Sequence, residues 1–209
     1  MSNETLTLGI INHRYANIHS VKKALRYVDC NYIELNDPSE FNKVSAIILP
    51  GVGAFDAAMQ VLNNSGMSDA LLEANSRKTP IFGICLGMQL LFNRSEEGNE
   101  DGLGLIDGEV KKIKQINDLK IPHMGWNELS IKVPNHPVLK NVRQGAFFYF
   151  VHSFQMALKE EKFVIATTDY GGPITAIVGI NNIIGTQFHP EKSQKMGLAM
   201  LENFLNWRP

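Results

Sequence analysis

The stretch Ile81-Phe82-Gly83-Ile84-Cys85-Leu86-Gly87-Met88-Gln89 decides the fold of this chain. Apolar and small residues run into a single cysteine, a glycine follows two positions later, and an apolar helical pattern then resumes. This order predicts a strand that ends in a tight turn, from which a helix begins, with the thiol at the apex. The glycines at positions 83 and 87 allow strand and helix to pack closely around that turn.

Two interpretations of Cys85 follow from this placement. A cysteine at a helix N-terminus faces unpaired backbone N–H groups and the positive end of the helix dipole, which favour the thiolate. The Gly-x-Cys-x-Gly pattern also matches the geometry of a nucleophile elbow. A free cysteine is, however, commonly a small apolar core residue. A base elsewhere in the chain is needed to decide between the two.

The composition predicts a chain that folds without disulfides or metals. Of the 209 residues 44% are apolar, enough for a full core. Lys and Arg number 20 and Asp and Glu number 21, which argues against nucleic acid or an anionic membrane as the main partner. No apolar run approaches a membrane span, and residues 1–7 lack the apolar core of a signal peptide. Two cysteines, Cys30 and Cys85, fit a reducing compartment. We expect one cytoplasmic domain over residues 1–209.

Strands alternate with helices in the first half of the chain. Continuous apolar runs predict buried strands over residues 6–11, 32–35, 46–49 and 81–84. Spaced apolar residues predict helices over 18–28, with Asn17 as N-cap, and over 55–62 and 67–76. Such an alternation indicates a parallel sheet covered on both faces. Ligands bind beyond the carboxyl ends of such strands, where Gly53 and Cys85 both lie.

The second half has a different character. Residues 95–104 are acidic and glycine-rich and predict an exposed loop. Short strands are then expected over 110–116, 126–133, 147–152, 163–168, 174–179 and 183–188, followed by a helix over 197–207. The expected fold class is α/β, a mostly parallel open sheet flanked by helices, with a mixed or antiparallel extension in the second half.

A second motif, Ile183-Ile184-Gly185-Thr186-Gln187-Phe188-His189-Pro190-Glu191, supplies the base. A strand delivers a histidine at its end, proline restricts the turn, and a carboxylate follows two residues later. A nucleophilic cysteine needs a base, and the base needs an acceptor that orients its other ring nitrogen. We expect His189 and Glu191 to meet across the turn, at the same edge of the sheet as Cys85.

These two motifs resemble those of the triad, or class I, glutamine amidotransferases, and the resemblance covers nearly the whole chain. In that family a cysteine attacks the side-chain amide of L-glutamine, ammonia leaves, and water hydrolyses the glutamyl thioester. The resemblance implies that Cys85 is the nucleophile, that His189 is the general base and then the acid, and that Glu191 orients His189.

The segment Pro50-Gly51-Val52-Gly53 resembles the oxyanion strand of that family. A backbone N–H at Gly53 and the N–H of Leu86, directly after the nucleophile, are the expected oxyanion donors. A phosphate-binding loop is the alternative, but no lysine or serine follows, as a P-loop requires. The resemblance further implies a set of substrate contacts, with the α-carboxylate held near residues 152–153: Gly51, Val52, Gln89, Val151, His152 and Ser153.

Residues 122–127 and 148–153 are similar to the glutaminase subunits of imidazole glycerol phosphate synthase. In that family ammonia passes through a closed route to a (β/α)₈ cyclase, which makes imidazole glycerol phosphate and AICAR in histidine biosynthesis. The expected partner is therefore a cyclase subunit in a heterodimer, and no acceptor domain is recognisable in the 209 residues. No cofactor is expected, and no metal, because no pair of histidines or cysteines has ligand spacing. The implied partner contacts are Asn17, Met124, Trp126 and Lys192.

One segment departs from the family pattern. The loop Asn12-His13-Arg14-Tyr15-Ala16-Asn17 lacks the glycines that usually stand between the first strand and the first helix. Three other interpretations therefore remain open. The chain could be a paralogue that supplies ammonia to another acceptor, such as a surface sugar. It could be a stand-alone γ-glutamyl or cysteine hydrolase, or a non-catalytic protein that keeps the fold. Dependence of the activity on a partner and on Cys85 distinguishes them.

Overall fold

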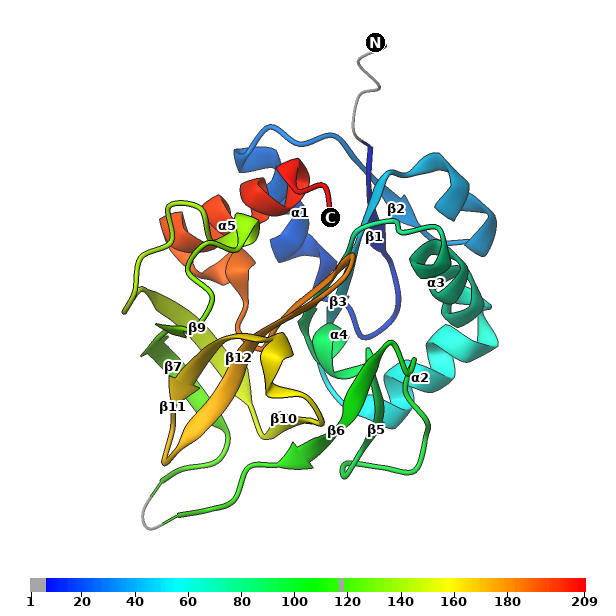
Figure 1. The fold of residues 1–209 in the computed structure, drawn as a ribbon. Helices are drawn as coiled ribbons and strands as arrows, with labels where there is room; N and C mark the ends of the chain where they lie inside the picture. Colours follow the sequence, from blue (N-terminus) through cyan, green and yellow to red (C-terminus); the bar gives the residue numbers. More distant parts are fainter. Residues whose placement is uncertain (1–6, 117–118) are drawn as a thin grey trace.

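The centre of the molecule is an eight-stranded sheet, seen in a computed structural model that describes residues 7–116 and 119–209 (Figure 1). Five neighbouring strands run parallel, in the spatial order β2 (Tyr32–Leu35), β1 (Leu8–Ile11), β3 (Ala46–Gly51), β4 (Ile81–Cys85) and β13 (Ile183–Thr186). Beyond β13 the order continues antiparallel with β12 (Pro173–Ile180), β11 (Val164–Asp169) and β8 (Ser130–Ile131).

Two smaller sheets flank this one at the second half of the chain. One comprises β10 (Phe154–Leu158), β6 (Ile106–Lys112) and β5 (Phe92–Ser95), and the other pairs β7 (His123–Glu128) with β9 (Phe147–His152). Figure 1 shows β5, β6 and β10 below α4 and shows β7 and β9 to its left, and α4 directly follows the carboxyl end of β4. They therefore build walls around the carboxyl edge of the parallel strands.

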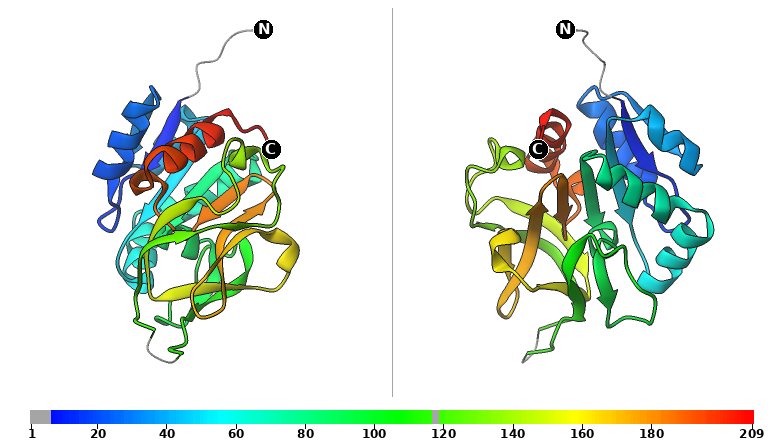
Figure 2. Two further views of the ribbon diagram at one scale, coloured as in Figure 1. Left: turned by 90° about the vertical axis from the view of Figure 1, so that its left-hand side faces the viewer. Right: turned by 45° about the vertical axis from the view of Figure 1, so that its right-hand side comes forward.

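Helices cover both faces of the parallel strands. Helices α1 (Ile18–Tyr27) and α5 (Gln194–Asn206) share one apolar core, and α2 (Phe55–Asn64) and α3 (Met67–Ser76) share the other. Figure 2 shows α1 and α5 side by side on one flank. The described residues also contain four 3₁₀ turns: η1 (Pro38–Lys43), η2 (Pro137–Leu139), η3 (Glu161–Phe163) and η4 (Pro190–Lys192). None of the helices in the described ranges has the length and apolarity needed to span a membrane.

The predicted fold class is confirmed, and the parallel strands and first-half helices lie where the apolar patterns place them. Several boundaries in the second half were wrong. The expected strand over 126–133 is divided into β7 and β8, and the strand expected over 110–116 is β6, which begins at Ile106. Strand β5 was missed because its four residues, FNRS, are mostly polar. Strand β10 was missed because it follows β9 after one residue, without a turn sequence. Leu6 lies outside the described residues.

Two local expectations also need correction. The helix after Cys85 is a single turn, α4 (Leu86–Gln89), because the chain must leave for β5 three residues later. Asn17 precedes α1 as expected, but its side chain makes no capping hydrogen bond.

The turn at Cys85 is packed backbone against backbone. A Cβ atom added to Gly51 would lie 2.7 Å from the backbone nitrogen of Gly87, and one added to Gly83 would lie 2.8 Å from the Gly87 carbonyl oxygen. At Gly87 itself a Cβ would overlap the Leu49 carbonyl oxygen. The predicted close approach of strand and helix is confirmed, and it requires the glycines.

Substitution of Gly87 tests this packing. We expect Gly87→Ala to lower the free energy of unfolding by about 3 kcal/mol, because the methyl group meets a backbone carbonyl that cannot move independently. Gly172→Ala is the control. A Cβ there has no atom within 4 Å, so only its positive φ adds a cost, about 1 kcal/mol. Urea unfolding measures the free energy of unfolding of both variants. An equal decrease in the two would contradict the packing argument.

Candidate active site

Cys85 stands at the apex of the turn between β4 and α4. Its backbone has φ 54° and ψ −112°, a conformation that a residue with a side chain rarely adopts. The side chain packs against the core, yet it also lines a pocket of about 300 Å³. Strain at a pocket-lining cysteine favours the nucleophile interpretation over simple packing.

His189 and Glu191 lie beside this turn. Strand β13 runs parallel to β4, with Thr186 paired to Ile84, and so delivers His189 to the same edge as Cys85. The Nδ1 atom of His189 lies 2.8 Å from Oε1 of Glu191, and both side chains are almost fully buried. The Nε2 atom of His189 has no hydrogen-bond partner among the described residues. The expected meeting of imidazole and carboxylate is confirmed.

The charges around His189 determine its protonation. Burial by itself lowers its pKa, but the negative charge of the Cys85 thiolate and the hydrogen bond to Glu191 outweigh burial and raise the pKa to about 10. An ordinary histidine has lost its proton by neutral pH. His189 keeps its proton there, so an imidazolium lies beside Cys85.

The pocket brings together nine of the predicted residues. They come from the oxyanion strand, the elbow, the β9–β10 turn and the end of β13: Val52, Gly53, Cys85, Leu86, Gln89, Val151, His152, Ser153 and His189. Gly51 does not line it but pairs with Cys85 across β3 and β4. The Sγ atom of Cys85 lies 3.8 Å from the carbonyl oxygen of Val151.

Four residues at the site were missed. Gln187 is fully buried and its Nε2 donates to Cys85 Sγ at 3.6 Å, while its Oε1 accepts from Gln89 at 3.0 Å. A polar residue at the end of an apolar strand was the signal for it. Glu97, Pro122 and Phe154 also line the pocket. No local sequence pattern indicates that these three residues reach the pocket.

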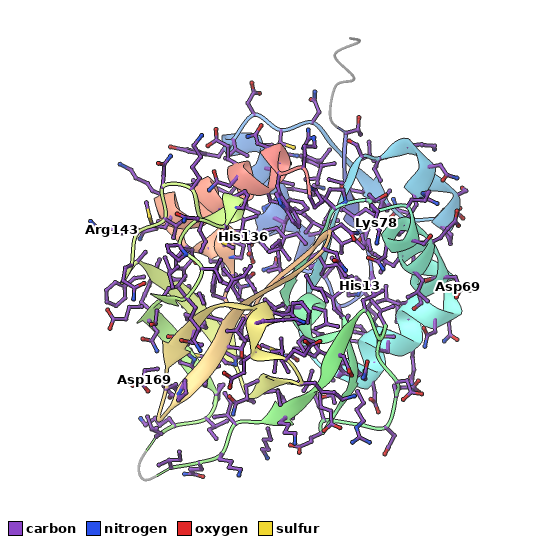
Figure 3. All side chains as sticks on the ribbon, in the orientation of Figure 1. His13, Asp69, Lys78, His136, Arg143 and Asp169 are labelled. Carbon is purple, nitrogen blue, oxygen red and sulfur yellow. The ribbon has the colours of Figure 1, made fainter. Side chains whose placement is uncertain are left out.

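The oxyanion strand is bonded to the loop over residues 12–17. The Val52 N–H donates to the Tyr15 carbonyl at 2.7 Å. The Nδ1 atom of His13 accepts from the Tyr15 N–H, so its Nε2 carries the proton and donates to the Pro50 carbonyl at 2.8 Å. Burial lowers the pKa of His13, which keeps the ring neutral. Figure 3 labels His13 in the interior of the molecule, away from solvent. This loop therefore keeps the Val52 N–H in a hydrogen bond to the Tyr15 carbonyl.

The residues expected at the partner surface lie in three parts of the chain: β7, η4 and the start of α1. Met124 and Trp126 project from the outer face of β7 and are 62% and 47% exposed. The Nζ atom of Lys192 lies 5.9 Å from the ring centre of Tyr149, which contacts Trp126 edge to face. Asn17 is half-buried before α1. Most of residues 122–127 belong to β7, and Ser193, next to Lys192, is buried.

Metal binding finds no support in the part of the chain that the structure describes. No group of three or more His, Cys, Asp or Glu side chains there could hold a metal ion.

Known proteins with similar sequences and folds match this chain. Residues 10–207 match the family model for glutamine amidotransferase class-I. The imidazole glycerol phosphate synthase subunit HisH of Rhodopseudomonas palustris is 44% identical over 98% of this chain and 100% of that protein. The HisH subunit of Halalkalibacterium halodurans is 43% identical over 94% of each. Among solved structures, PurLQS from Thermotoga maritima has a TM-score of 0.74 at 19% identity, covering 97% of this chain and 98% of that one.

The chain belongs to the class I glutamine amidotransferases and, within them, to the family of the HisH subunits of imidazole glycerol phosphate synthase. It is therefore an amidotransferase enzyme, and the resemblance seen in its motifs is confirmed. The structural likeness to PurLQS supports the fold alone.

The protonation of His189 can be measured directly. Replacing Cys85 with alanine removes the charge that opposes burial, so we expect the pKa of His189 to fall by more than about one unit. Titration of ¹⁵N-histidine signals by NMR gives this value. Cys30→Ala is the matched control, because Cys30 lies outside the pocket, and it should leave the pKa near that of the unmodified protein. An unchanged pKa in Cys85→Ala would contradict the assignment of the raised His189 pKa to Cys85.

Proposed function

We propose that this chain is the glutaminase subunit of imidazole glycerol phosphate synthase. It hydrolyses L-glutamine to glutamate and passes ammonia to a cyclase subunit, which makes imidazole glycerol phosphate and AICAR. The observation that carries the proposal is the His189–Glu191 hydrogen bond beside Cys85 in one pocket. The 43–44% identity to HisH subunits over almost the full chain supports the choice of synthase.

The chemistry follows from the proton on His189. The Cys85 thiolate attacks the side-chain carbonyl carbon of glutamine, and a carbon–sulfur bond forms. His189 gives its proton to the amide nitrogen, the carbon–nitrogen bond breaks, and ammonia leaves a glutamyl thioester. His189, now neutral, takes a proton from water, whose oxygen attacks the thioester carbon; the carbon–sulfur bond breaks, glutamate leaves, and the Cys85 thiolate is restored beside protonated His189. Glu191 fixes the ring so that Nε2 performs both transfers.

The rest of the pocket would hold the amino-acid end of glutamine. The turn of Val151, His152 and Ser153 offers backbone groups to the α-carboxylate, and Gln89 lies on the opposite side. Glu97 is the carboxylate that lines the pocket, and we assign it to the α-ammonium on charge. These are the polar contacts that would orient the side-chain amide toward Cys85.

The oxyanion hole would need two N–H donors, from Leu86 and from the strand over residues 51–53. The Val52 N–H is occupied by Tyr15 in this conformation. Gly53, at φ 93°, flanks a peptide that could turn its N–H toward the pocket. We therefore propose that the isolated subunit hydrolyses glutamine slowly and that partner binding releases this bond.

The outer face of β7 is the proposed docking surface for the cyclase. Met124 and Trp126 expose apolar area there, and Lys192 and Asn17 lie at the same edge. An exposed apolar group of this kind marks an interaction site. Burial under a partner would exclude water, which matters because ammonia that becomes ammonium is no longer a nucleophile.

We further propose that residues 1–209 act as one domain in the cytoplasm and need no cofactor. The two cysteines are both free, as a reducing compartment favours. The proposed reaction uses side chains, backbone N–H groups and water.

Glutaminase assays with and without the cyclase test the function. We expect slow hydrolysis by the subunit alone, strong stimulation by the cyclase and its nucleotide ligand, and loss of turnover in Cys85→Ala. Glu191→Gln should lower kcat by about a hundredfold, because His189 loses its orienting charge. Cys30→Ala is the matched control and should retain activity.

The outcomes separate the alternatives. Hydrolysis that requires Cys85 but ignores the cyclase would favour another acceptor or a stand-alone hydrolase. Full function in Cys85→Ala would favour a non-catalytic role.

His13 provides a test of the oxyanion strand. Removing its imidazole takes away the bonds to Pro50 and Tyr15, so the loop holds Val52 less firmly. We expect His13→Ala to raise cyclase-independent hydrolysis about fivefold, the equivalent of one hydrogen bond. His19→Ala changes an exposed histidine at the start of α1 and is the control. Lower basal activity in His13→Ala, with His19→Ala unchanged, would show that the loop supports rather than restrains the strand.

A further inference from the structure

Four groups form a hydrogen-bonded chain behind the pocket. Asn127 Nδ2 lies 3.2 Å from His123 Nε2, and His123 Nδ1 lies 2.9 Å from His152 Nε2. His152 Nδ1 in turn lies 2.7 Å from the carbonyl oxygen of Phe154. The chain connects β7 to the β9–β10 turn that lines the pocket.

The direction of every bond in this chain is determined. A carbonyl only accepts, so His152 must carry its proton on Nδ1 when it donates to Phe154. The Nε2 of the neutral His152 ring is then an acceptor, and His123 must donate to it from Nδ1. The Nε2 of His123 accepts in turn from the Asn127 amide. Both rings are therefore neutral and protonated on Nδ1.

Asn127 is itself held in the required orientation. Its Nδ2 also donates to the Asp169 carbonyl at 2.8 Å, and its Oδ1 accepts from the Glu128 N–H at 2.8 Å. An amide flip would place Oδ1 against the Asp169 carbonyl and lose both bonds. Figure 3 shows Asp169 at the edge of the molecule, at the end of β11.

Aromatic rings enclose the His123 end. His123 stacks between Tyr170, at 4.0 Å between ring centres, and Phe150, at 4.8 Å. Burial lowers the pKa of His123 to about 4 and that of His152 to about 3, and for His152 the neighbouring histidines add to this effect. The two rings thus stay neutral while His189 beside them carries the charge.

The segment at the end of this chain forms one wall of the pocket. Residues 151–154 all line it, and the Ser153 carbonyl accepts from the Ile113 N–H on the opposite side. Within the turn, the His152 side chain donates a hydrogen bond to the Phe154 backbone carbonyl and so ties the two residues together. A proton relay is excluded, because the chain ends on a carbonyl that cannot pass a proton on.

We propose that His123 is a positioning residue for the amino-acid end of the substrate. By donating from Nδ1 to His152, it fixes the ring that holds the 151–154 turn in its binding geometry, and Asn127 fixes His123. That the substrate is glutamine rests on the proposed function. That His123 positions the 151–154 turn rests on the hydrogen bonds alone. The same strand carries Met124 and Trp126 on its other face.

Three variants test this role. His123→Leu removes the donor to His152. His123→Asn keeps an N–H near the position of Nδ1 and is the rescuing variant. His136→Leu is the matched control, since this partly buried histidine lies beside α5, outside the chain of bonds (Figure 3).

Two readouts are measured on the full chain, in a Cys30→Ala background so that Cys85 is the only thiol. The first is the ¹⁵N NMR signature of His152, a pyrrole-like Nδ1 with a pyridine-like Nε2. The second is inactivation of Cys85 by 6-diazo-5-oxo-L-norleucine, compared with alkylation by iodoacetamide, which has no amino-acid end.

We expect His123→Leu to mix the His152 tautomers and to raise the half-saturating concentration of the glutamine analogue about tenfold. The iodoacetamide rate should change less than about twofold, because the thiolate is untouched. His123→Asn should restore the half-saturating concentration to within about threefold, and His136→Leu should change neither readout.

Equal losses with both reagents would overturn the proposal, since they would indicate general damage to the site. So would an unchanged half-saturating concentration or tautomer in folded His123→Leu. If that variant does not fold, Asn127→Leu replaces it and should release the His123 tautomer and weaken saturation; no change there is equally contradictory. Absence of saturable inactivation in the unmodified chain would instead count against the proposed function, and the tautomer result would stand alone.

Discussion

The structure depends on the contact between two backbones at the end of β3 and β4. Cys85 is held at a positive φ that costs on the order of 1–3 kcal/mol, and it persists because α4 is pressed against β3. Only glycine at positions 51, 83 and 87 permits that approach. The same register places Gly51 opposite Cys85. Cys85 and the strand end at Gly51 are thereby neighbours before any side chain contributes.

Around this turn the protein keeps histidines in opposite protonation states. His189 has Glu191 and Cys85 beside it, and their influence overcomes the cost of burial and raises its pKa. The hydrogen-bond partners of His152 are the Phe154 carbonyl and the neutral His123 ring, so burial keeps it uncharged, and the charge of His189 nearby adds to this effect. Of the two histidines His189 and His152, only His189 therefore carries the extra proton. Because His152 is neutral, two imidazolium ions do not lie side by side. A second positive charge would lower the pKa of His189.

Strand β7 relates the pocket to the surface. Its residues alternate between faces, so His123 and Asn127 lie inward while Met124 and Trp126 lie outward. The loop over residues 12–17 makes a second connection, from the molecular edge to Pro50 and Val52. A partner at this edge would contact elements that are one hydrogen bond away from the catalytic machinery. The atypical sequence of that loop places His13, a buried neutral histidine, at the link.

The sequence by itself determined the parallel sheet, the turn at Cys85 and the meeting of His189 with Glu191. Each depends on apolar runs or on residues within two positions of one another. It did not determine β5 or β10, because short polar strands acquire their order from neighbours rather than from local propensity. Only the tertiary structure placed Gln187 on Cys85, 102 residues earlier, and joined His123 to His152 across 29 residues. Such bonds have directions and tautomers, and these follow from how buried donors and acceptors must be satisfied once the chain is packed.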